Sequence, residues 1–290
     1  MYAVIGITGQ VGGAVANSLL QRGEKIRAIV RNAEKAAEWK TRGAEIALAD
    51  VDDPEALKTA LSGVEGAFIM IPPNFAPTPG FLETRTTLAS LHKALSAALP
   101  KKVVYLSSIG SEQTHGLGLI TSTHLLEEQL GSLPIPSAFL RAGWFMENSQ
   151  WDVAAAREQG KFFSYLQPLD KRFPLVATED IGRTGADILL QEWGGNRYIE
   201  VAGPRQYSPY EIAESFAGVL GHSVEVIAVP REEWAQKFVE QGMPKDRTAP
   251  RIEMVEGFNS GLIHFGVPRA EHVIGRIDLK DVLQKLITRA

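Results

Sequence analysis

The stretch that decides the fold is YAVIGITGQVG, from Tyr2 to Gly12. An apolar run is followed by Gly6, Gly9 and Gly12, and then by apolar residues at helical spacing up to Gly23. This is the pattern of a strand, a tight turn and a helix, in which glycines permit the turn, admit an anion to the backbone and let the helix lie close to the strand. The start of the helix adds free N–H donors and the positive end of its dipole. The turn therefore indicates a diphosphate site, and a glycine-rich turn without a ligand is the alternative.

Apolar runs alternate with helix-period segments through the first half of the chain. We expect strands over residues 2–7, 25–31, 46–49, 67–71, 103–107 and 137–141, and helices over residues 10–22, 34–42, 54–61, 83–99 and 124–130. Such alternation is typical of a parallel sheet with helices on both faces. The sequence therefore predicts an α/β fold with a Rossmann doubly wound parallel sheet.

Past Gly143 the alternation degrades. We predict helices over residues 145–160, 178–192 and 208–221, a short strand over 198–201 and irregular chain over 161–173. Residues 1–144 and 176–204 are expected to form the Rossmann domain, and residues 145–175 and 205–290 a smaller α+β cap at its C-terminal side.

Composition narrows the function. With 290 residues, 44% of them hydrophobic and 22% charged, the chain has the composition of a globular enzyme and not of a disordered segment. A net charge of -4 without a basic cluster argues against nucleic acid as a partner. The absence of cysteine and of histidines at ligand spacing argues against a metal site. Because no charged leader precedes the first strand and no long apolar run follows, we expect a cytoplasmic protein that does not enter a membrane.

The end of the second predicted strand bears on the choice of nucleotide. NAD sites usually carry an acidic residue there to hold the ribose 2'-hydroxyl, but this chain has Arg31, with Lys35 shortly after it. A guanidinium cannot accept from a hydroxyl but can pair with a 2'-phosphate, which favours NADP(H) over NAD(H). An ordinary exposed arginine is the alternative. Asp50, after the third strand, could accept from the adenine amino group or be a plain loop aspartate.

Several stretches together resemble the NmrA-like branch of the atypical short-chain dehydrogenases. They are GITGQVG at 6–12, IVRN at 29–32, AD at 49–50, VVYLSS at 103–108, FLRAGWFMEN at 139–148, EDIG at 179–182 and VAGP at 201–204. The resemblance implies a Rossmann domain that binds NADP(H) and a small cap over the nicotinamide. The branch includes reductases of quinones, azo compounds and triphenylmethane dyes, and also members that bind the cofactor and regulate transcription without turnover.

The chain departs from the short-chain dehydrogenase pattern after the fifth strand. Those enzymes carry Tyr-x-x-x-Lys there, and the tyrosine exchanges a proton with the substrate while the lysine lowers its pKa. The resemblance aligns His124 with the lysine, Ile120 with the tyrosine and Glu128 with a glutamate four residues on. Isoleucine cannot donate a proton, whereas conjugated acceptors spread the incoming charge and can take a proton from water. We expect His124 to position the nicotinamide ribose, and the alternative is that it is itself the acid.

The carboxyl ends of parallel strands meet at one edge of the sheet, where ligands bind. We expect the cofactor to contact Gly6, Thr8, Gly9, Gln10, Val11, Gly12, Arg31, Lys35, Asp50, Pro72, Pro73, Ser107 and His124, with the two prolines on the nicotinamide side. The expected acceptor contacts are Asn74, Ser108, Trp144, Phe145 and Asn148, although an aromatic residue here can equally belong to the core.

These features predict an NADP(H)-dependent two-electron reductase of quinone-like, azo, triarylmethane or other conjugated small molecules. The alternative is a non-catalytic NADP(H) sensor that acts through a protein partner. A homodimer is left open.

Overall fold

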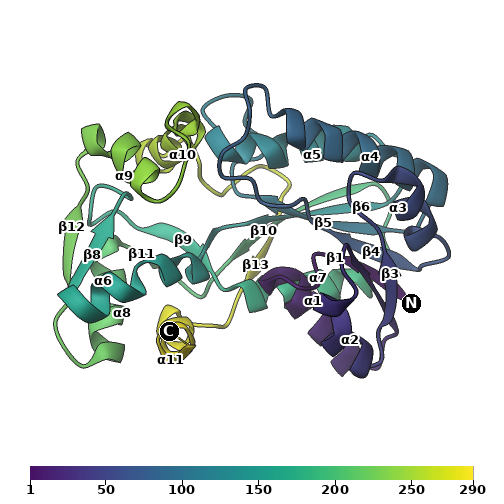
Figure 1. Ribbon diagram of the computed structural model, residues 1–290, viewed down its shortest axis with the longest axis horizontal. Helices are drawn as coiled ribbons and strands as arrows, with labels where there is room; N and C mark the ends of the chain where they lie inside the picture. The colour runs from purple at the N-terminus through teal and green to yellow at the C-terminus, as the bar shows by residue number, and fades with distance from the viewer. Residues whose placement is uncertain (290) are drawn as a thin grey trace.

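Eight strands, all parallel, form the central sheet in the order β13-β10-β6-β5-β4-β1-β2-β3 (Figure 1). The computed structural model describes residues 1–289. The strands are β1 (Tyr2–Ile5), β2 (Ile26–Val30), β3 (Glu45–Leu48), β4 (Gly66–Ile69), β5 (Val103–Ser108), β6 (Ser137–Ala142), β10 (Asn196–Ala202) and β13 (Glu271–Ile274). The first six strands along the chain run in the spatial order 3-2-1-4-5-6, which is the Rossmann order. The predicted fold class is confirmed.

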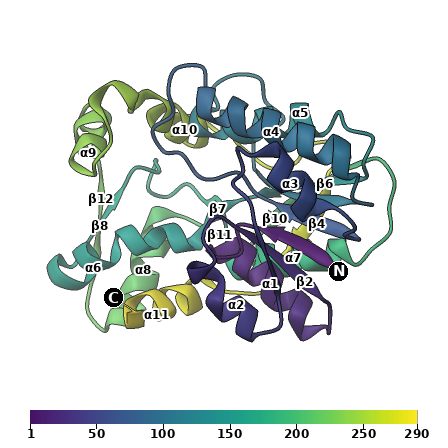
Figure 2. The same ribbon diagram turned by 45° about the vertical axis from the view of Figure 1, so that its right-hand side comes forward.

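Helices cover both faces of this sheet (Figures 1 and 2). One face carries α1 (Gln10–Gln21), α2 (Ala37–Thr41, after a 3-10 turn over Glu34–Ala36) and α7 (Thr178–Leu189). The other carries α3 (Pro54–Leu61), α4 (Leu82–Ala98) and α5 (Thr121–Leu130). Val4 packs into the first layer while Ala3 and Ile5 pack into the second, so β1 is buried on both faces and is apolar throughout.

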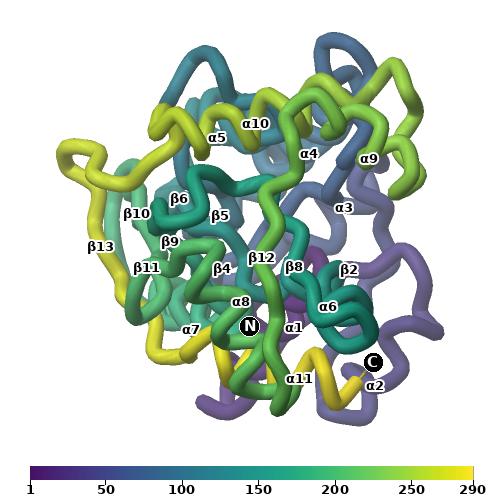
Figure 3. The backbone as a smooth tube through the Cα atoms, turned by 90° about the vertical axis from the view of Figure 1, so that its left-hand side faces the viewer, coloured from purple at the N-terminus to yellow at the C-terminus, as the bar shows by residue number. Residues whose placement is uncertain are grey.

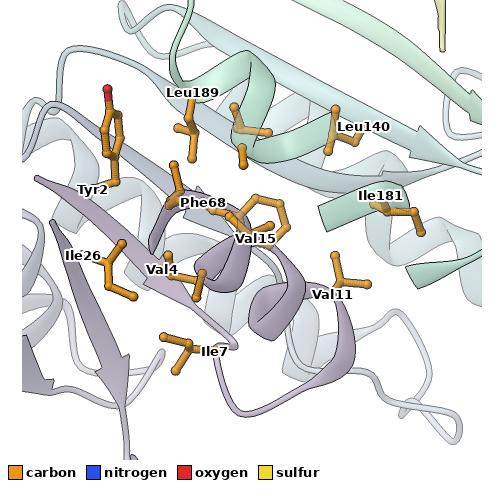
Figure 4. Packing of buried hydrophobic residues seen from close by; sticks show 14 of the residues in the cluster. Tyr2, Val4, Ile7, Val11, Val15, Ile26, Phe68, Leu140, Ile181 and Leu189 are labelled. Atoms are coloured by element: carbon orange, nitrogen blue, oxygen red, sulfur yellow. The ribbon is translucent and has the colours of Figure 1, made fainter. Parts of the chain in front are cut away.

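The layer between α1, α7 and the sheet is tightly packed (Figure 4). Val15 of α1, Phe68 of β4 and Ile181 of α7 meet there and are fully buried. A Cβ atom on Gly182 would lie 2.3 Å from the Cβ of Ala14, so α7 can approach α1 this closely only with glycine at that position. In this way residues 176–204 return to the main sheet through α7 and β10.

The remaining elements lie beyond the carboxyl edge of the sheet. They are β7 (Trp144–Phe145), the 3-10 helix η3 (Met146–Trp151), α6 (Val153–Gln159), β8 (Lys161–Ser164), β9 (Phe173–Val176), β11 (Gln206–Tyr207), α8 (Pro209–Leu220), β12 (Glu225–Ala228), η4 (Arg231–Glu233), α9 (Trp234–Glu240), η5 (Lys245–Arg247), α10 (Ala249–Ser260) and α11 (Leu279–Arg289). A further 3-10 turn, η2 (Gly118–Ile120), precedes α5. Two small sheets, β11-β9-β7 and β12-β8, hold this cap together, and Figure 3 shows β8 and β12 side by side.

Several predictions for this half are wrong. The helix predicted over 145–160 begins as strand and 3-10 helix and becomes α-helical only at Val153, and the irregular segment 161–173 contains β8. β8 pairs with β12 some sixty residues later, a partner that no local pattern announces. β13 pairs with β10 in the main sheet, although it lies in a segment predicted as cap. Within residues 1–289, no helix is long and apolar enough to cross a membrane.

Candidate functional site

The glycine turn joins β1 to α1 as the spacing predicts. Gly6 has a φ of +80°, and the N–H of Gly9 donates to its carbonyl oxygen at 2.9 Å. A Cβ atom on Gly12 would lie 2.2 Å from that same oxygen, so only glycine lets the helix start this close to the strand. Thr8, Gly9 and Gln10 are exposed at the surface of the turn.

The first turn of α1 offers free backbone donors. Gly9 is the N-cap, no side chain caps the helix, and no acidic residue stands in its first turn. The N–H groups of the next three residues therefore have no partner within the helix, and with the helix dipole they suit an anion. The side chain of Val11 is buried in the core, so Val11 and Gly12 could reach a ligand only through their main chain.

A pocket of about 280 Å³ lies at the carboxyl ends of β2, β3 and β4. Its walls bring together five of the residues that the sequence singles out: Arg31, Asp50, Pro72, Pro73 and Asn74. The three residues after β4 therefore lie beside Arg31 and Asp50, and the expectation that they line the nicotinamide side stays a prediction. Lys35 is exposed on the 3-10 turn before α2 and is not part of the wall.

The pocket wall carries one cation, Arg31, beside the carboxylates of Asp50, Asp52 and Glu83. Arg31 is exposed and forms no hydrogen bond or salt bridge with any of residues 1–289. Asp50 accepts from the N–H of Asp52 at 3.1 Å, and Asp52 accepts from the hydroxyl of Thr87 at 2.7 Å. Asn74 accepts from the N–H of Ala76 at 3.0 Å, which shapes the turn after β4. Among the residues that line this pocket, the side chain of Arg31 is the charged donor that can pair with a phosphate of a nucleotide.

A buried ionic network closes the carboxyl end of β5. The hydroxyl of Ser107 donates to Glu127 at 2.6 Å and lies 3.1 Å from the hydroxyl of Ser111. Arg141 of β6 pairs with both carboxylate oxygens of Glu127, at 3.0 and 2.6 Å, and reaches Glu112 at 3.1 Å. Ser107 is 3% exposed, so its hydroxyl serves this network and does not face an open site.

Glu127, Arg141 and Ser111 are not among the site residues that the sequence predicts. The sequence signal that could have revealed them is Arg141, a cation within an otherwise apolar strand. A cation that is buried there needs a buried carboxylate as its partner.

His124 is held by one hydrogen bond to the backbone. Its Nδ1 lies 2.9 Å from the carbonyl oxygen of Ser111, and its Nε2 lies 3.7 Å from the carboxylate of Glu128. Because a carbonyl only accepts, Nδ1 carries the proton and Nε2 of the neutral ring is an acceptor. The neutral ring can therefore hold a ribose hydroxyl, but it can act as an acid only after taking up a second proton.

The two neighbouring glutamates of α5 differ in their surroundings. The glutamate that pairs with the arginine of β6 is Glu127, whereas Glu128, which the resemblance aligns with the family glutamate, is exposed. Counting four residues back from Glu127 reaches Thr123, whose hydroxyl lies 2.7 Å from that of Ser111. If Glu127 is instead taken as the family glutamate, the tyrosine place falls on Leu119. Neither residue carries a hydroxyl, so the absence of the family acid holds in both alignments.

The predicted acceptor contacts separate into two groups. Trp144 is half-buried and meets Phe258 of α10 edge-on at 5.3 Å, and Asn148 on η3 is exposed. Phe145 packs against the core between the sheet and α1, which is the alternative reading for an aromatic residue here. Ser108 is half-buried and donates to the carbonyl of Ile109 at 3.2 Å.

A second pocket, of about 290 Å³, lies between the starts of α1 and α7 and the C-terminal helix α11. Gly9 and Gln10 form one side of it. Glu147 lines it too, but its carboxylate already accepts from the N–H of Thr178 at 3.0 Å and from the hydroxyl at 2.7 Å, which caps α7. Within residues 1–289 no cluster of side chains could hold a metal ion.

The strand order and the glycine turn between β1 and α1 define a dinucleotide-binding protein of the Rossmann class. The chain belongs to the NmrA-like family, which it matches over residues 2–263.

Relatives and solved structures agree with this assignment. The chain is 28% identical over 246 residues to NAD(P)H azoreductase of Xenophilus azovorans, covering 84% of this chain and 82% of that protein. It is similar in structure to the NADPH-dependent quinone oxidoreductase of Escherichia coli complexed with NADPH, with a TM-score of 0.77 at 25% identity over 99% of this chain and 95% of that one. The triphenylmethane reductase of Citrobacter sp. shares the fold, with a TM-score of 0.81 at 23% identity over 99% of each chain.

Proposed function

We propose that this chain is an NADP(H)-dependent oxidoreductase that transfers two electrons to a conjugated electrophile of the quinone, azo or triarylmethane type. The choice of a conjugated acceptor rests on one observation, the apolar side chain after β5 at the position of the family's tyrosine. A free glycine turn and an unpaired Arg31 provide for the cofactor, but Ile120 or Leu119 stands where a proton donor would be needed for a ketone. The identities of the relatives support the class of reaction.

Each part of the site has a distinct task in this proposal. The N–H groups at the start of α1 bind the diphosphate, and Arg31 binds the 2'-phosphate through charge-assisted bonds. Bound NADPH supplies the hydride. His124 accepts from a ribose hydroxyl through Nε2 and so orients the nicotinamide half. Trp144 and Asn148 lie on the cap side, where they flank a flat acceptor.

A conjugated acceptor suits a site without a protein acid. Hydride delivery to an isolated carbonyl creates a localised alkoxide that must be protonated or stabilised by the enzyme. A quinone or a triarylmethane cation spreads the two electrons over its rings, so the protein needs only to hold two planar groups in contact. Water then supplies the proton to a quinone or azo product.

Stopped-flow mixing tests the proposal directly. The protein with bound NADPH is mixed with a quinone, an azo dye and a basic triarylmethane dye, and nicotinamide absorbance is followed, with cyclohexanone as the matched non-conjugated carbonyl. We expect rapid oxidation by at least one conjugated acceptor and none by cyclohexanone. A flat trace with every acceptor, beside tight NADPH binding, would instead favour the sensor function.

A further inference from the structure

Thr84 stands in the first turn of α4 and lines the pocket at the carboxyl ends of β2, β3 and β4. The residue is only 8% exposed, and its hydroxyl forms no hydrogen bond with any of residues 1–289. The hydroxyl oxygen is not one of the polar atoms that the fold closes off from solvent. Because Thr84 forms part of the pocket wall, we take this small accessible part to be its opening to the pocket.

The other two threonines of α4 use their hydroxyls within the protein. Thr87, three residues on and also in the pocket wall, donates to the carboxylate of Asp52 at 2.7 Å. Thr86, on the exposed side of the helix, donates to the carbonyl oxygen of Leu82 at 3.0 Å. Among the threonines of α4, the hydroxyl of Thr84 therefore has a donor and acceptor left for a ligand.

The rest of the wall indicates the kind of ligand. Val51, Ile71 and Pro72 give the pocket, of about 280 Å³, an apolar surface between the polar groups. An occupant that covers the hydroxyl of Thr84 without offering it a partner loses the free energy of that group's hydration. The pocket therefore suits a molecule with apolar faces and hydrogen-bonding atoms on its edge, and a nucleobase has both.

The two polar groups of the wall suit different atoms of such a base. Asp50 accepts from the N–H of Asp52 through Oδ1, and its Oδ2 takes no hydrogen bond from any of residues 1–289. A carboxylate only accepts, so it suits the amino group of adenine, whereas a hydroxyl has a proton to donate and suits a ring nitrogen. Arg31 on the same wall is the group for the phosphate of the ribose.

We propose that the hydroxyl of Thr84 donates a hydrogen bond to a ring nitrogen of the adenine of NADP(H), with the amino group of the base toward Asp50. The inference rests on the proposed function for the identity of the nucleotide, and it adds a residue that determines which base is held. Thr84 is thus a binding residue on α4, outside the glycine turn and the strand ends.

Titration calorimetry with 2',5'-ADP, the adenosine half of the cofactor, tests the contact apart from turnover. Thr84→Val keeps the shape of the side chain and should lower the affinity about five- to tenfold, as for the loss of one hydrogen bond, whereas Thr84→Ser should stay within about twofold. Thr86→Val is the matched control and should not change the affinity. Because Thr84 forms no hydrogen bond within the protein, Thr84→Val should keep the melting temperature of the wild type.

A second arm uses the unmodified protein and decides the matter if Thr84→Val does not fold. The 1-deaza, 3-deaza and 7-deaza forms of 2',5'-ADP each replace one acceptor nitrogen of the base by C–H. We expect one of them to bind about tenfold more weakly than 2',5'-ADP, and this difference to disappear in Thr84→Val. Equal affinity of the wild type for all three analogues and the parent, unchanged affinity in Thr84→Val, or no binding of 2',5'-ADP would overturn the contact.

Reduction is followed separately with NADPH and the conjugated acceptors. Since 2',5'-ADP has no nicotinamide, its binding does not depend on the reaction. A loss of affinity in Thr84→Val beside no oxidation of NADPH by any acceptor would leave the contact standing and refute the proposed function. Rapid oxidation beside an affinity that Thr84→Val does not change would do the reverse.

Discussion

At the scale of single residues, we propose that Arg31 decides the preference for NADPH over NADH. It is an exposed guanidinium at the wall of a pocket, free of any partner among residues 1–289, so a 2'-phosphate would gain its full charge-assisted bonding. Arg31→Ala should lower the affinity for NADPH by about 1.5 to 3 kcal/mol and leave that for NADH nearly unchanged. Calorimetric titration with both nucleotides measures this, with Lys40→Ala on α2 as a control for the loss of an exposed cation. An unchanged ratio would mean that the phosphate lies elsewhere.

Two glycines of the same turn should respond differently to alanine. At Gly12 the new methyl would lie 2.2 Å from the carbonyl oxygen of Gly6. Gly12→Ala should therefore lower the free energy of unfolding by at least about 1 to 3 kcal/mol, the usual cost of overpacking a core. At Gly9 the nearest atom is that oxygen at 3.3 Å, so Gly9→Ala should fold. Its methyl would occupy the space of the diphosphate, and NADPH binding should fall at least tenfold. Thermal unfolding and titration of both variants separate the two roles; normal NADPH binding by Gly9→Ala would make the turn purely structural.

At the scale of elements, the pair of Glu127 with Arg141 joins α5 to β6, and Ser107 of β5 donates to the same carboxylate. Both side chains are buried, so removing one charge leaves the other buried without a partner. Arg141→Met should therefore destabilise the protein by about 3 to 5 kcal/mol, whereas Arg172→Ala, which breaks an exposed ion pair with Glu211, should cost about 1 kcal/mol or less. Urea unfolding of the two variants gives the comparison. Similar small losses of unfolding free energy in both variants would show that the buried pair does not stabilise the fold.

Ser107 belongs to the same network and is a direct test of it. The sequence predicts a cofactor contact at this position, but the hydroxyl is directed to Glu127. Ser107→Ala should cost about 1 kcal/mol of stability, the usual value for one hydrogen bond, and leave the dissociation constant of NADPH within about twofold. A large loss of NADPH affinity in a variant with a normal melting temperature would restore the sequence prediction.

The proposed role of His124 on α5 can be tested by the pH dependence of the proposed reaction. Because Nδ1 of His124 donates to a carbonyl, the neutral ring has no second proton to give. If it only positions the ribose, the single-turnover rate at saturating NADPH should be flat across about pH 5.5 to 8.5, the range of an ordinary histidine titration. His124→Ala should lower the rate without adding a pH dependence. A rate that falls about tenfold per pH unit in the wild type, and loses that slope in His124→Ala, would make the imidazole the acid.

At the scale of the whole molecule, local sequence decides the Rossmann half and distant pairing decides the rest. The first six strands stand within their predicted ranges or one residue beyond, because each is an apolar run bounded by its own glycine or proline. β8 and β13 are not predicted from the sequence because their partner strands, β12 and β10, are distant along the chain. Likewise the glycine turn can be found by its position in the sequence, whereas the hydrogen bond of Ser107 with Glu127 of α5 follows only from the packing of the folded chain.

Asp180 connects the two halves, and it gives the last prediction. It is fully buried at the start of α7, and its Oδ2 accepts from the N–H groups of Arg276 and Ile277, at 2.8 and 2.9 Å, just before α11. A Cβ atom on Gly275 would lie 2.3 Å from that oxygen, so the chain passes directly over the carboxylate. The main sheet thereby holds the segment that leads from β13 into the C-terminal helix.

Asp180→Ala leaves two buried N–H groups without an acceptor, at about 1 to 3 kcal/mol each. We expect a loss of about 2 to 5 kcal/mol in unfolding free energy and faster hydrogen exchange confined to residues 275–289 before global unfolding. The control on the same helix is Glu179→Gln, which removes an exposed pair with Lys285 and should cost less than about 1 kcal/mol. Uniformly faster exchange over the whole chain would instead mean that Asp180 supports the Rossmann core and not the C-terminal segment alone.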